Sequence, residues 1–237
     1  MAQDLAVVMP VYNEADCIVE VIDSWRSMLT EQRIDFRMIV LNDGSRDGTA
    51  DALKAFAGDG RIEIVNKPNS GHGPTILQGY RRAVEIARWV FQVDSDNEMG
   101  PEHFPHFWRI REDYDAILGI RGGREQNAPR RVISAASRLA VGMMYGKGVV
   151  DVNVPYRLIR ADMLKGIIAQ IPADTFAPNV VISGALSRSG VRIWNEKVPF
   201  RGRTTGTVSI VKWKLWKSAA RALWQTIRCR HIATGSH

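Results

Sequence analysis

The feature that most constrains the fold is an alternation of short apolar runs with stretches of helical spacing. The apolar runs occupy residues 5–9, 37–41, 62–65 and 89–93. Between the first two, residues 15–29 repeat apolar side chains every three or four positions, which is typical of a helix that packs through one face. Strand–helix alternation of this kind predicts an α/β fold, with a single Rossmann-like, mostly parallel sheet flanked by helices.

Each of the four apolar runs leads into a polar loop. The loops contain residues 12–14, 43–45, 70–73 and 94–96, and we expect Asn13 in the first to cap the following helix. Because ligands of parallel α/β sheets bind beyond the carboxyl ends of the strands, four such loops together indicate a binding site there. The third loop is glycine-rich and opens a helix, so its backbone N–H groups could approach a phosphate, helped by the helix dipole.

An acidic stretch follows the fourth apolar run. Asp94 and Asp96 would point to the same side of an extended strand, and Glu98 would continue the row if the backbone stays extended. Three close carboxylates repel one another, and they become stable together when a hard divalent cation lies between them. A cation with few protein ligands keeps open positions that suit the oxygens of a diphosphate. The alternative is an acidic loop in contact with water.

Length and composition bound the remaining possibilities. The chain of 237 residues has 45% hydrophobic and 24% charged residues, which fits one globular domain, and we place this domain at 1–207. The sequence contains neither a secretory signal nor a run of about 18 apolar residues that could cross a membrane. Cys17 and Cys229 lie far apart without metal-ligand spacing, which is typical of reduced thiols in a cytosolic protein.

Positive charge is concentrated at the C-terminal end. The net charge is +7, and the chain from Lys197 onward holds nine Lys or Arg and no acid, so residues 1–196 carry −2. Within 208–237, three tryptophans and several aliphatic residues repeat at helical spacing, and basic residues occupy much of the remaining surface. This profile predicts a basic amphipathic helix at a membrane interface. The alternatives are a helix that packs on its own domain or on another subunit. The confinement of charge to one segment argues against a nucleic-acid partner.

The order of these motifs resembles family 2 glycosyltransferases of the GT-A fold. Within that family the chain looks most similar to the dolichol/polyprenyl-phosphate mannose synthase-like branch, over about residues 5–209. The segments that carry the resemblance are 8–14, 42–49, 94–98, 119–121, 130–138, 151–157 and 203–206. The first three segments are specific to the superfamily, and the later ones decide only the branch.

The resemblance implies a nucleotide-sugar donor, either a GDP-sugar or a UDP-sugar. Together with the glycine-rich loop, the residues expected at the donor are Pro10, Tyr12, Glu14, Asp43, Gly71, His72, Asp94 and Arg203. Asp43 is expected to meet the base, because a carboxylate can accept the imide N–H of uracil or the N1–H and N2–H of guanine. The alternative for Asp43 is a turn residue before Gly44, and His72 could equally be an ordinary loop histidine.

The resemblance also implies a metal cofactor. Asp94, Asp96 and Glu98 would hold Mg²⁺ or Mn²⁺ against the diphosphate, where the metal neutralises charge on the departing nucleoside diphosphate. Asp96 is therefore expected to be a catalytic residue.

At the acceptor end, the resemblance implies that Arg121, Arg130 and Ser134 bind the phosphate of a polyprenyl lipid. The planar fork of arginine can bridge two phosphate oxygens. The alternative is an exposed basic loop and helix. A phosphate monoester is ionised near neutral pH and requires no strong base, whereas a sugar hydroxyl would require one. Asp151 is the catalytic candidate in that case, and its alternative is a capping or ion-pairing role.

Three residues depart from the pattern of the branch. Pro155 stands where glycine is usual, Asn179 stands near a position where relatives often carry an acid, and Ser209 comes one residue late. These departures leave the donor sugar and the acceptor open. The prediction is a metal-dependent, inverting glycosyltransferase that acts on polyprenyl phosphate at the cytoplasmic face of the membrane. The alternatives are a glycosyltransferase with a hydroxyl acceptor and a catalytically silent nucleotide- or membrane-binding module.

Overall fold

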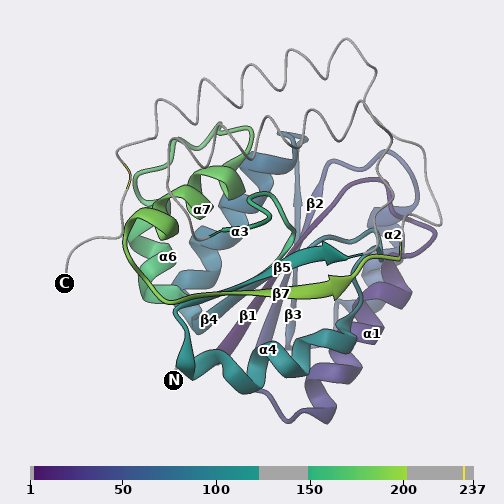
Figure 1. The fold of residues 1–237 in the computed structure, drawn as a ribbon. Coiled ribbons are helices and arrows are strands. Elements are labelled where there is room, and N and C mark those ends of the chain that lie inside the picture. The colour runs from purple at the N-terminus through teal and green to yellow at the C-terminus, as the bar shows by residue number, and fades with distance from the viewer. Residues whose placement is uncertain (1–2, 123–148, 202–231, 233–237) are drawn as a thin grey trace.

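The computed structural model describes residues 3–122, 149–201 and 232, and these form a seven-stranded sheet with helices on both faces (Figure 1). Arg130, Ser134, Arg203 and the predicted helix within 208–237 lie outside the described residues. The predicted α/β class with a mostly parallel sheet is confirmed.

The strands are ordered β3-β2-β1-β4-β6-β5-β7 across the sheet. Their bounds are Gln3–Val11 for β1, Phe36–Asp43 for β2, Ile62–Lys67 for β3, Ala87–Val93 for β4, Ala116–Gly122 for β5, Tyr156–Arg160 for β6 and Ile193–Pro199 for β7. The first four strands pair in parallel, and β5 pairs in parallel with β7. Strand β6 runs antiparallel to both of its neighbours, β4 and β5. The carboxyl ends of the other strands therefore share one edge of the sheet.

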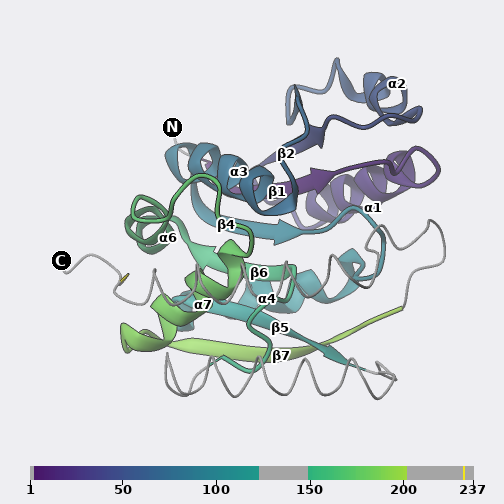
Figure 2. The same ribbon diagram turned by 90° about the horizontal axis from the view of Figure 1, so that it is seen from above.

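Helices cover the two faces of the sheet as separate groups. The helices are α1 (Ile18–Glu31), α2 (Thr49–Leu53), α3 (His72–Ile86), α4 (Phe104–Ile110), α6 (Ala161–Ile168) and α7 (Pro178–Arg188), with short 3₁₀ turns at Lys54–Phe56, Pro101–His103 and Arg111–Asp113. Helices α1 and α4 pack on one face, and α3, α6 and α7 pack on the other (Figure 2). None of the described helices is both long enough and apolar enough to cross a membrane.

Strand β1 is buried on both faces, which explains its continuous apolar sequence. Alternate side chains divide between two cores: Leu5 and Val7 join the α1 side, while Ala6 and Val8 join the α3 side. Helix α3 comes very close to this strand because it presents Gly79, where an added Cβ would lie 2.4 Å from Val8 Cγ1. This contact brings the N-terminal end of α3 over the carboxyl edge of the sheet.

The core beneath α1 and α4 is aromatic. The ring of Phe91 on β4 lies 4.6 Å from Phe104, 4.8 Å from Tyr156 and 5.2 Å from Trp25, measured between centroids. The first two pairs are edge-to-face, the arrangement that the charge distribution of aromatic rings favours. Tyr156 thereby fastens β6 into the sheet, although its hydroxyl has no hydrogen-bond partner within the described part of the chain.

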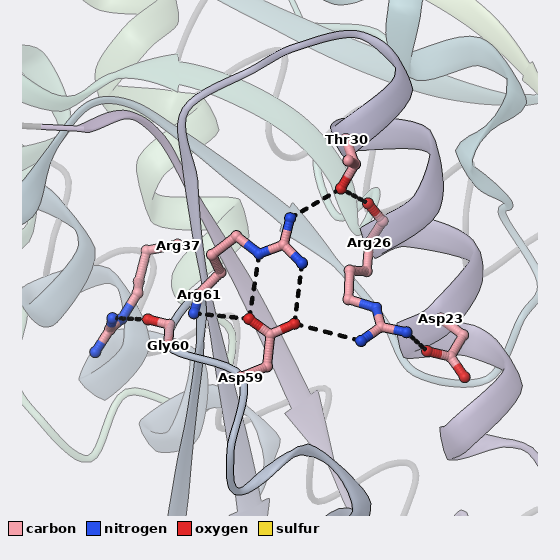
Figure 3. A network of polar contacts seen from close by, with 7 residues as sticks. All are labelled: Asp23, Arg26, Thr30, Arg37, Asp59, Gly60 and Arg61. Carbon is pink, nitrogen blue, oxygen red and sulfur yellow. Dashed lines mark hydrogen bonds and ion pairs between the residues drawn. The ribbon is translucent and has the colours of Figure 1, made fainter.

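A polar network fastens the turn before β3 to α1, at the edge of the sheet opposite the predicted site (Figure 3). Asp59 accepts hydrogen bonds from Nε and Nη2 of Arg61, at 3.2 and 3.1 Å, and from Arg26 Nη1 at 3.3 Å. Arg61 also donates to Thr30 Oγ1 at 3.0 Å. The hydrogen bonds of Arg61 lower the pKa of Asp59 from 3.8 to about 2.

One local expectation is wrong in detail. Asn13 does not cap α1, which begins after Cys17 without a side-chain cap. Instead, Asn13 has a φ of 55° and its Oδ1 accepts the N–H of Arg46 at 2.8 Å, so it ties the loop after β1 to the loop after β2. Residues 156–160 form the antiparallel strand β6.

Candidate active site

The four predicted strand-end loops meet around one cavity of about 520 Å³. The residues that line it are Pro10, Val11, Tyr12, Glu14, Asp43, Asn69, Gly71, His72, Thr75, Asp94, Ser95 and Asp96. Eight of these are residues predicted at the donor or the metal. Among the others, Thr75 could have been anticipated from its place in the first turn of a helix that faces the cavity. Glu98, Arg121 and Asp151 are outside this lining.

Asp43 is held by the loop that enters α3. Its side chain is 5% exposed and forms an ion pair with Lys67, whose side chain is 12% exposed. Its two carboxylate oxygens also accept the backbone N–H groups of Ser70 at 2.8 Å and Gly71 at 2.9 Å. Burial by itself would raise the pKa of Asp43, but Lys67 and these donors outweigh burial and leave the pKa below its ordinary value. Asp43 is thus an ionised anchor for the loop 67–71.

Lys67 extends the same anchor into the first turn of α3. Its Nζ donates to Ser70 Oγ at 2.7 Å and to Thr75 Oγ1 at 3.1 Å. Gly71 precedes the helix with a φ of 92°, a conformation that side-chain-bearing residues rarely adopt. The N-terminal end of α3, a 15-residue helix, therefore borders the cavity and presents its positive dipole end there.

The acidic stretch after β4 does not continue as a strand. Strand β4 ends at Val93, and Asn97 has a left-handed backbone with a φ of 57°. Asp96 Oδ1 accepts the N–H of Glu98 at 3.2 Å, which closes a local turn. Because the extended backbone is broken there, the row predicted for Asp94, Asp96 and Glu98 is not formed.

Asp94 and Asp96 both line the cavity, and Asp94 Oδ1 lies 3.8 Å from His72 Nε2. Burial raises the pKa of Asp94, His72 opposes the rise, and the negative charge of Asp96 adds to it. Among the described residues, no group of three or more His, Cys, Asp or Glu side chains is arranged to hold a metal ion. The two carboxylates offer the hard oxygen ligands that Mg²⁺ and Mn²⁺ prefer, and a cation between them would relieve their repulsion. The two aspartates therefore fit a divalent cation, and Glu98 as a third ligand stays a prediction.

Arg121 and Asp151, assigned to separate roles by sequence, form a bidentate ion pair. Arg121 Nε donates to Asp151 Oδ2 at 2.8 Å, and Nη2 donates to Oδ1 at 3.0 Å. Both side chains are partly exposed, at 24% and 20%. Burial would raise the pKa of Asp151, but the hydrogen bonds and charge of Arg121 leave it below its ordinary value. Asp151 is therefore a weak base, and its predicted ion-pairing alternative describes the arrangement found.

Arg121 also connects this pair to the acidic stretch. The charges of Asp94 and Glu98, as well as that of Asp151, favour the charged form of the Arg121 guanidinium and contribute to its raised pKa. The sequence suggested that a metal balances the negative charge of the acidic stretch. Arg121 thus balances part of this charge. This arrangement depends on β5 and the segment before β6 lying beside the end of β4, which no single sequence motif indicates.

The fold and the cavity place the chain among α/β proteins that bind a ligand beyond the carboxyl ends of a parallel sheet. Residues 6–167 match the family model described as glycosyl transferase family 2. Because this match covers more than half of the chain, the chain belongs to glycosyl transferase family 2, and the predicted resemblance is confirmed.

Two curated relatives act on lipid phosphates, by their names. An undecaprenyl-phosphate 4-deoxy-4-formamido-L-arabinose transferase of Pseudomonas aeruginosa is 29% identical over 178 residues, which are 73% of this chain and 52% of the relative. This chain thus spans about half the length of that transferase. An undecaprenyl-phosphate mannosyltransferase of Micrococcus luteus is 28% identical over 244 residues, with 94% of this chain and 97% of the relative covered.

The fold matches solved structures of glucosyl-3-phosphoglycerate synthase from Mycobacterium tuberculosis. The complex with Mn²⁺, UDP-glucose and phosphoglyceric acid aligns with a TM-score of 0.72 at 17% identity, over 98% of this chain and 81% of that one. The structure with phosphoglyceric acid alone aligns with a TM-score of 0.69 at 19% identity, over 98% and 82%. At this level of identity the match concerns the fold, and it confirms the predicted GT-A architecture.

Proposed function

We propose that this chain is a metal-dependent, inverting glycosyltransferase that moves a sugar from a nucleoside diphosphate sugar to polyprenyl phosphate. The observation that carries the proposal is the adjacency of two features at one sheet edge. One is the cavity lined by Asp94 and Asp96, and the other is the Arg121 guanidinium, which interacts with Asp94 and holds a carboxylate in bidentate geometry. Membership of glycosyl transferase family 2 and the names of the lipid-phosphate relatives support the same activity.

The donor would occupy the cavity between β1, β2, α3 and β4. Its volume of about 520 Å³ lies within the usual range for a small-molecule site. The diphosphate would lie toward Asp94 and Asp96, near the N-terminal end of α3. Mg²⁺ or Mn²⁺ held by those two aspartates would neutralise the charge that develops on the leaving nucleoside diphosphate.

Asp43 would contribute to base recognition through the loop it shapes. Its two oxygens already accept protein donors, so a nucleobase N–H would share or replace one of them. The choice between UDP and GDP is therefore left to experiment, with both classes of donor included.

The acceptor would bind at Arg121. A phosphate monoester presents two oxygens in a plane, as the Asp151 carboxylate does, so it can replace that carboxylate on the guanidinium. An oxygen of the ionised phosphate would then form the new bond to the sugar C1 as the bond from C1 to the diphosphate breaks on the opposite face. No proton has to be removed, which agrees with the weak basicity of Asp151. Arg130 and Ser134 are proposed as further phosphate ligands from the sequence resemblance alone.

A polyprenyl acceptor requires contact with a membrane. The basic, tryptophan-containing segment within 208–237 is proposed to lie at the cytoplasmic interface of that membrane, with its cations toward anionic headgroups. Arg203, just before this segment, is proposed to reach the donor diphosphate.

The direct test incubates the purified full chain with undecaprenyl phosphate, a panel of UDP- and GDP-sugars, and Mg²⁺ or Mn²⁺. We expect one donor class to yield a glycosylated lipid phosphate detectable by mass spectrometry, with activity abolished by EDTA. Asp96→Ala should reduce transfer by about 10²- to 10³-fold, because several kcal/mol of charge stabilisation is lost.

The matched control is Asp51→Asn, which removes an exposed carboxylate on α2, away from the cavity. It should leave transfer unchanged. Absence of transfer with every donor, or an Asp96→Ala variant as active as the Asp51→Asn control, would contradict the proposal.

A further inference from the structure

Arg157 on β6 is a cation with no access to solvent, at 0% exposure. Its Nε donates to Val154 O at 2.9 Å, and its Nη2 donates to Val152 O at 3.2 Å. Its Nη1 donates to Asn179 O at 3.2 Å and to Ser183 Oγ at 3.4 Å. Every one of these acceptors is a neutral oxygen. Burial lowers the pKa of Arg157, while the charges of Asp151 and Asp94 favour its charged form.

Among the described residues, Arg157 hydrogen-bonds only neutral groups. A buried guanidinium of this kind is costly to fold, because no directly paired carboxylate compensates for its lost hydration. Buried groups that break the ordinary rules of packing tend to occur at functional sites. The role of Arg157 should therefore follow from the segments that its hydrogen bonds hold in place.

These contacts hold the turn that begins with Asp151. Val152 O and Val154 O both belong to this turn, and Val152 O accepts a second hydrogen bond, from Ser183 Oγ at 2.9 Å. Within the turn, Val154 N–H donates to Asp151 O at 3.4 Å. Arg157 and Ser183 therefore fix the backbone immediately after Asp151, while Arg121 holds the Asp151 carboxylate through two hydrogen bonds.

The same frame continues toward the donor end. The residue whose carbonyl accepts from Arg157 is Asn179, and Asn179 Nδ2 donates to Gln92 Oε1 at 2.9 Å. Gln92 Oε1 also accepts from Tyr80 Oη at 2.7 Å, and Gln92 Nε2 reaches Asp94 Oδ1 at 3.4 Å. A continuous polar path, buried as far as Gln92, thus joins the Asp151 turn to Asp94. The path also gives a structural role to Asn179, which stands near a position where relatives often carry an acid. In this chain the buried Asn179 links Arg157 to Gln92 through hydrogen bonds.

We propose that Arg157 is a positioning residue, supported by Ser183, that holds the 151–154 turn so that the Asp151 carboxylate can orient Arg121 for the acceptor. The part of this inference that concerns the acceptor rests on the proposed function. The part that concerns the turn does not, and it can be measured without any substrate.

The first test is hydrogen–deuterium exchange of the full chain, comparing wild type with Ser183→Ala and Arg157→Lys. Ser183→Ala removes one donor to Val152 O and leaves Arg157 in place. Arg157→Lys keeps the positive charge, but an ammonium group cannot replace the planar guanidinium that donates to the separate carbonyls of Val152 and Val154. We expect exchange in a peptide covering 149–156 to rise by about 3- to 10-fold in Ser183→Ala, as for the loss of one hydrogen bond, and further in Arg157→Lys. Exchange at 71–76 should stay unchanged.

Two neighbouring substitutions serve as matched controls. Ile182→Val removes one buried methyl group beside Ser183 on α7 and touches no polar contact. Tyr156→Phe removes a buried hydroxyl that has no hydrogen-bond partner among the described residues, next to Arg157 on β6. Neither should change exchange at 149–156, even if Ile182→Val lowers the melting temperature.

The second test measures transfer kinetics with farnesyl phosphate as a short acceptor probe. Ser183→Ala should raise the acceptor KM by about 3- to 10-fold and leave the melting-temperature shift produced by the nucleotide unchanged. If Ser183→Ala and Arg157→Lys only lower stability, with exchange and acceptor KM equal to those of Ile182→Val, the positioning role is wrong. If no acceptor is turned over, the exchange result alone decides the inference, and only the proposed function has failed.

Discussion

The two ends of the site, the proposed donor end and the proposed acceptor end, are each organised by an ion pair, and the two pairs differ in their access to solvent. At the donor end, Asp43 and Lys67 are 5% and 12% exposed, and backbone donors satisfy the carboxylate further. At the acceptor end, Arg121 and Asp151 are 24% and 20% exposed and bind each other through two hydrogen bonds. The first pair is an internal support for a loop, and the second is open to exchange with a ligand.

This difference reflects what each pair must do. A buried pair is difficult to break because either partner alone would be an uncompensated charge in the interior. A partly exposed pair is stabilised less, since water can solvate both partners when they separate. A site would use one pair of each kind if it binds one anionic ligand in a preformed pocket and a second anionic ligand that displaces a carboxylate from an arginine.

The largest effect should come from breaking the donor-end pair. Lys67→Met leaves the buried Asp43 carboxylate without its cationic partner, which should cost about 3 kcal/mol of unfolding free energy. For a chain of this size the melting temperature should fall by about 6–12 °C. The control Lys54→Met removes an exposed ion pair on the surface and should leave the melting temperature unchanged. Equal shifts in the two variants would contradict the support role of Lys67.

The acceptor-end pair should be less important for stability and more important for binding. Arg121→Lys replaces a bidentate fork with a point charge, so the acceptor KM should rise by about 10- to 100-fold. The melting-temperature shift produced by the nucleotide should be retained, because the cavity lining does not include Arg121. Arg192→Lys, an exposed arginine paired with Asp115, provides the control and should leave both measurements at wild-type values.

The network around Asp59 provides a reference that is remote from both ends. Its lowered pKa, about 2 against 3.8, means that the folded state favours the charged carboxylate. The resulting stability is fully present above about pH 4 and is lost as the pH falls through about 2. Asp59→Asn should cost about 1 kcal/mol at pH 7, allowing for screening by solvent around its partly exposed partners. The difference from wild type, measured by denaturant titration, should disappear toward pH 2; a constant difference would show that the charge is not responsible.

The smallest effect separates the two kinds of acceptor. Asp151→Asn removes the weak base and keeps a side chain of the same size, so kcat for transfer to a phosphate acceptor should change by less than about 3-fold. The acceptor KM should rise, because the amide cannot accept both hydrogen bonds from Arg121. The pH dependence of kcat between pH 6 and 8 should also remain that of the wild type, because the lowered pKa of Asp151 keeps it ionised throughout. Loss of activity by 10²-fold or more, with the nucleotide shift retained, would instead indicate a hydroxyl acceptor and a catalytic base at Asp151.

Much of the donor end could be predicted because its parts are local in sequence. Each apolar run ends in its own polar loop, and parallel pairing brings the loops to one edge, so Tyr12, Asp43, His72 and Asp94 meet as expected. The detailed geometry could not be predicted in the same way. The backbone turns at Asn97, between the two aspartates and Glu98, and a local preference of this kind is too weak to be predicted from the residue types.

The acceptor end shows the opposite balance. Arg121 and Asp151 were each singled out, but their contact joins residues 30 positions apart and was not anticipated. Arg157 was noted only as part of a motif, and its buried contacts with Val152 and Asn179 arise from the insertion of β6 between β4 and β5. Antiparallel insertion of a short strand leaves little trace in the hydrophobic pattern, because β6 is buried like its neighbours.

The sequence by itself determined the α/β class, the parallel pairing of the first four strands and the set of loops around the cavity. It did so because hydrophobic periodicity and strand-end polarity are properties of consecutive residues. The tertiary structure alone decided which charges compensate one another: Lys67 for Asp43, Arg121 for Asp151, and a buried Arg157 behind the Asp151 turn. The physical reason is that electrostatic compensation depends on distance in space and on burial, and neither quantity is encoded in the spacing of residues along the chain.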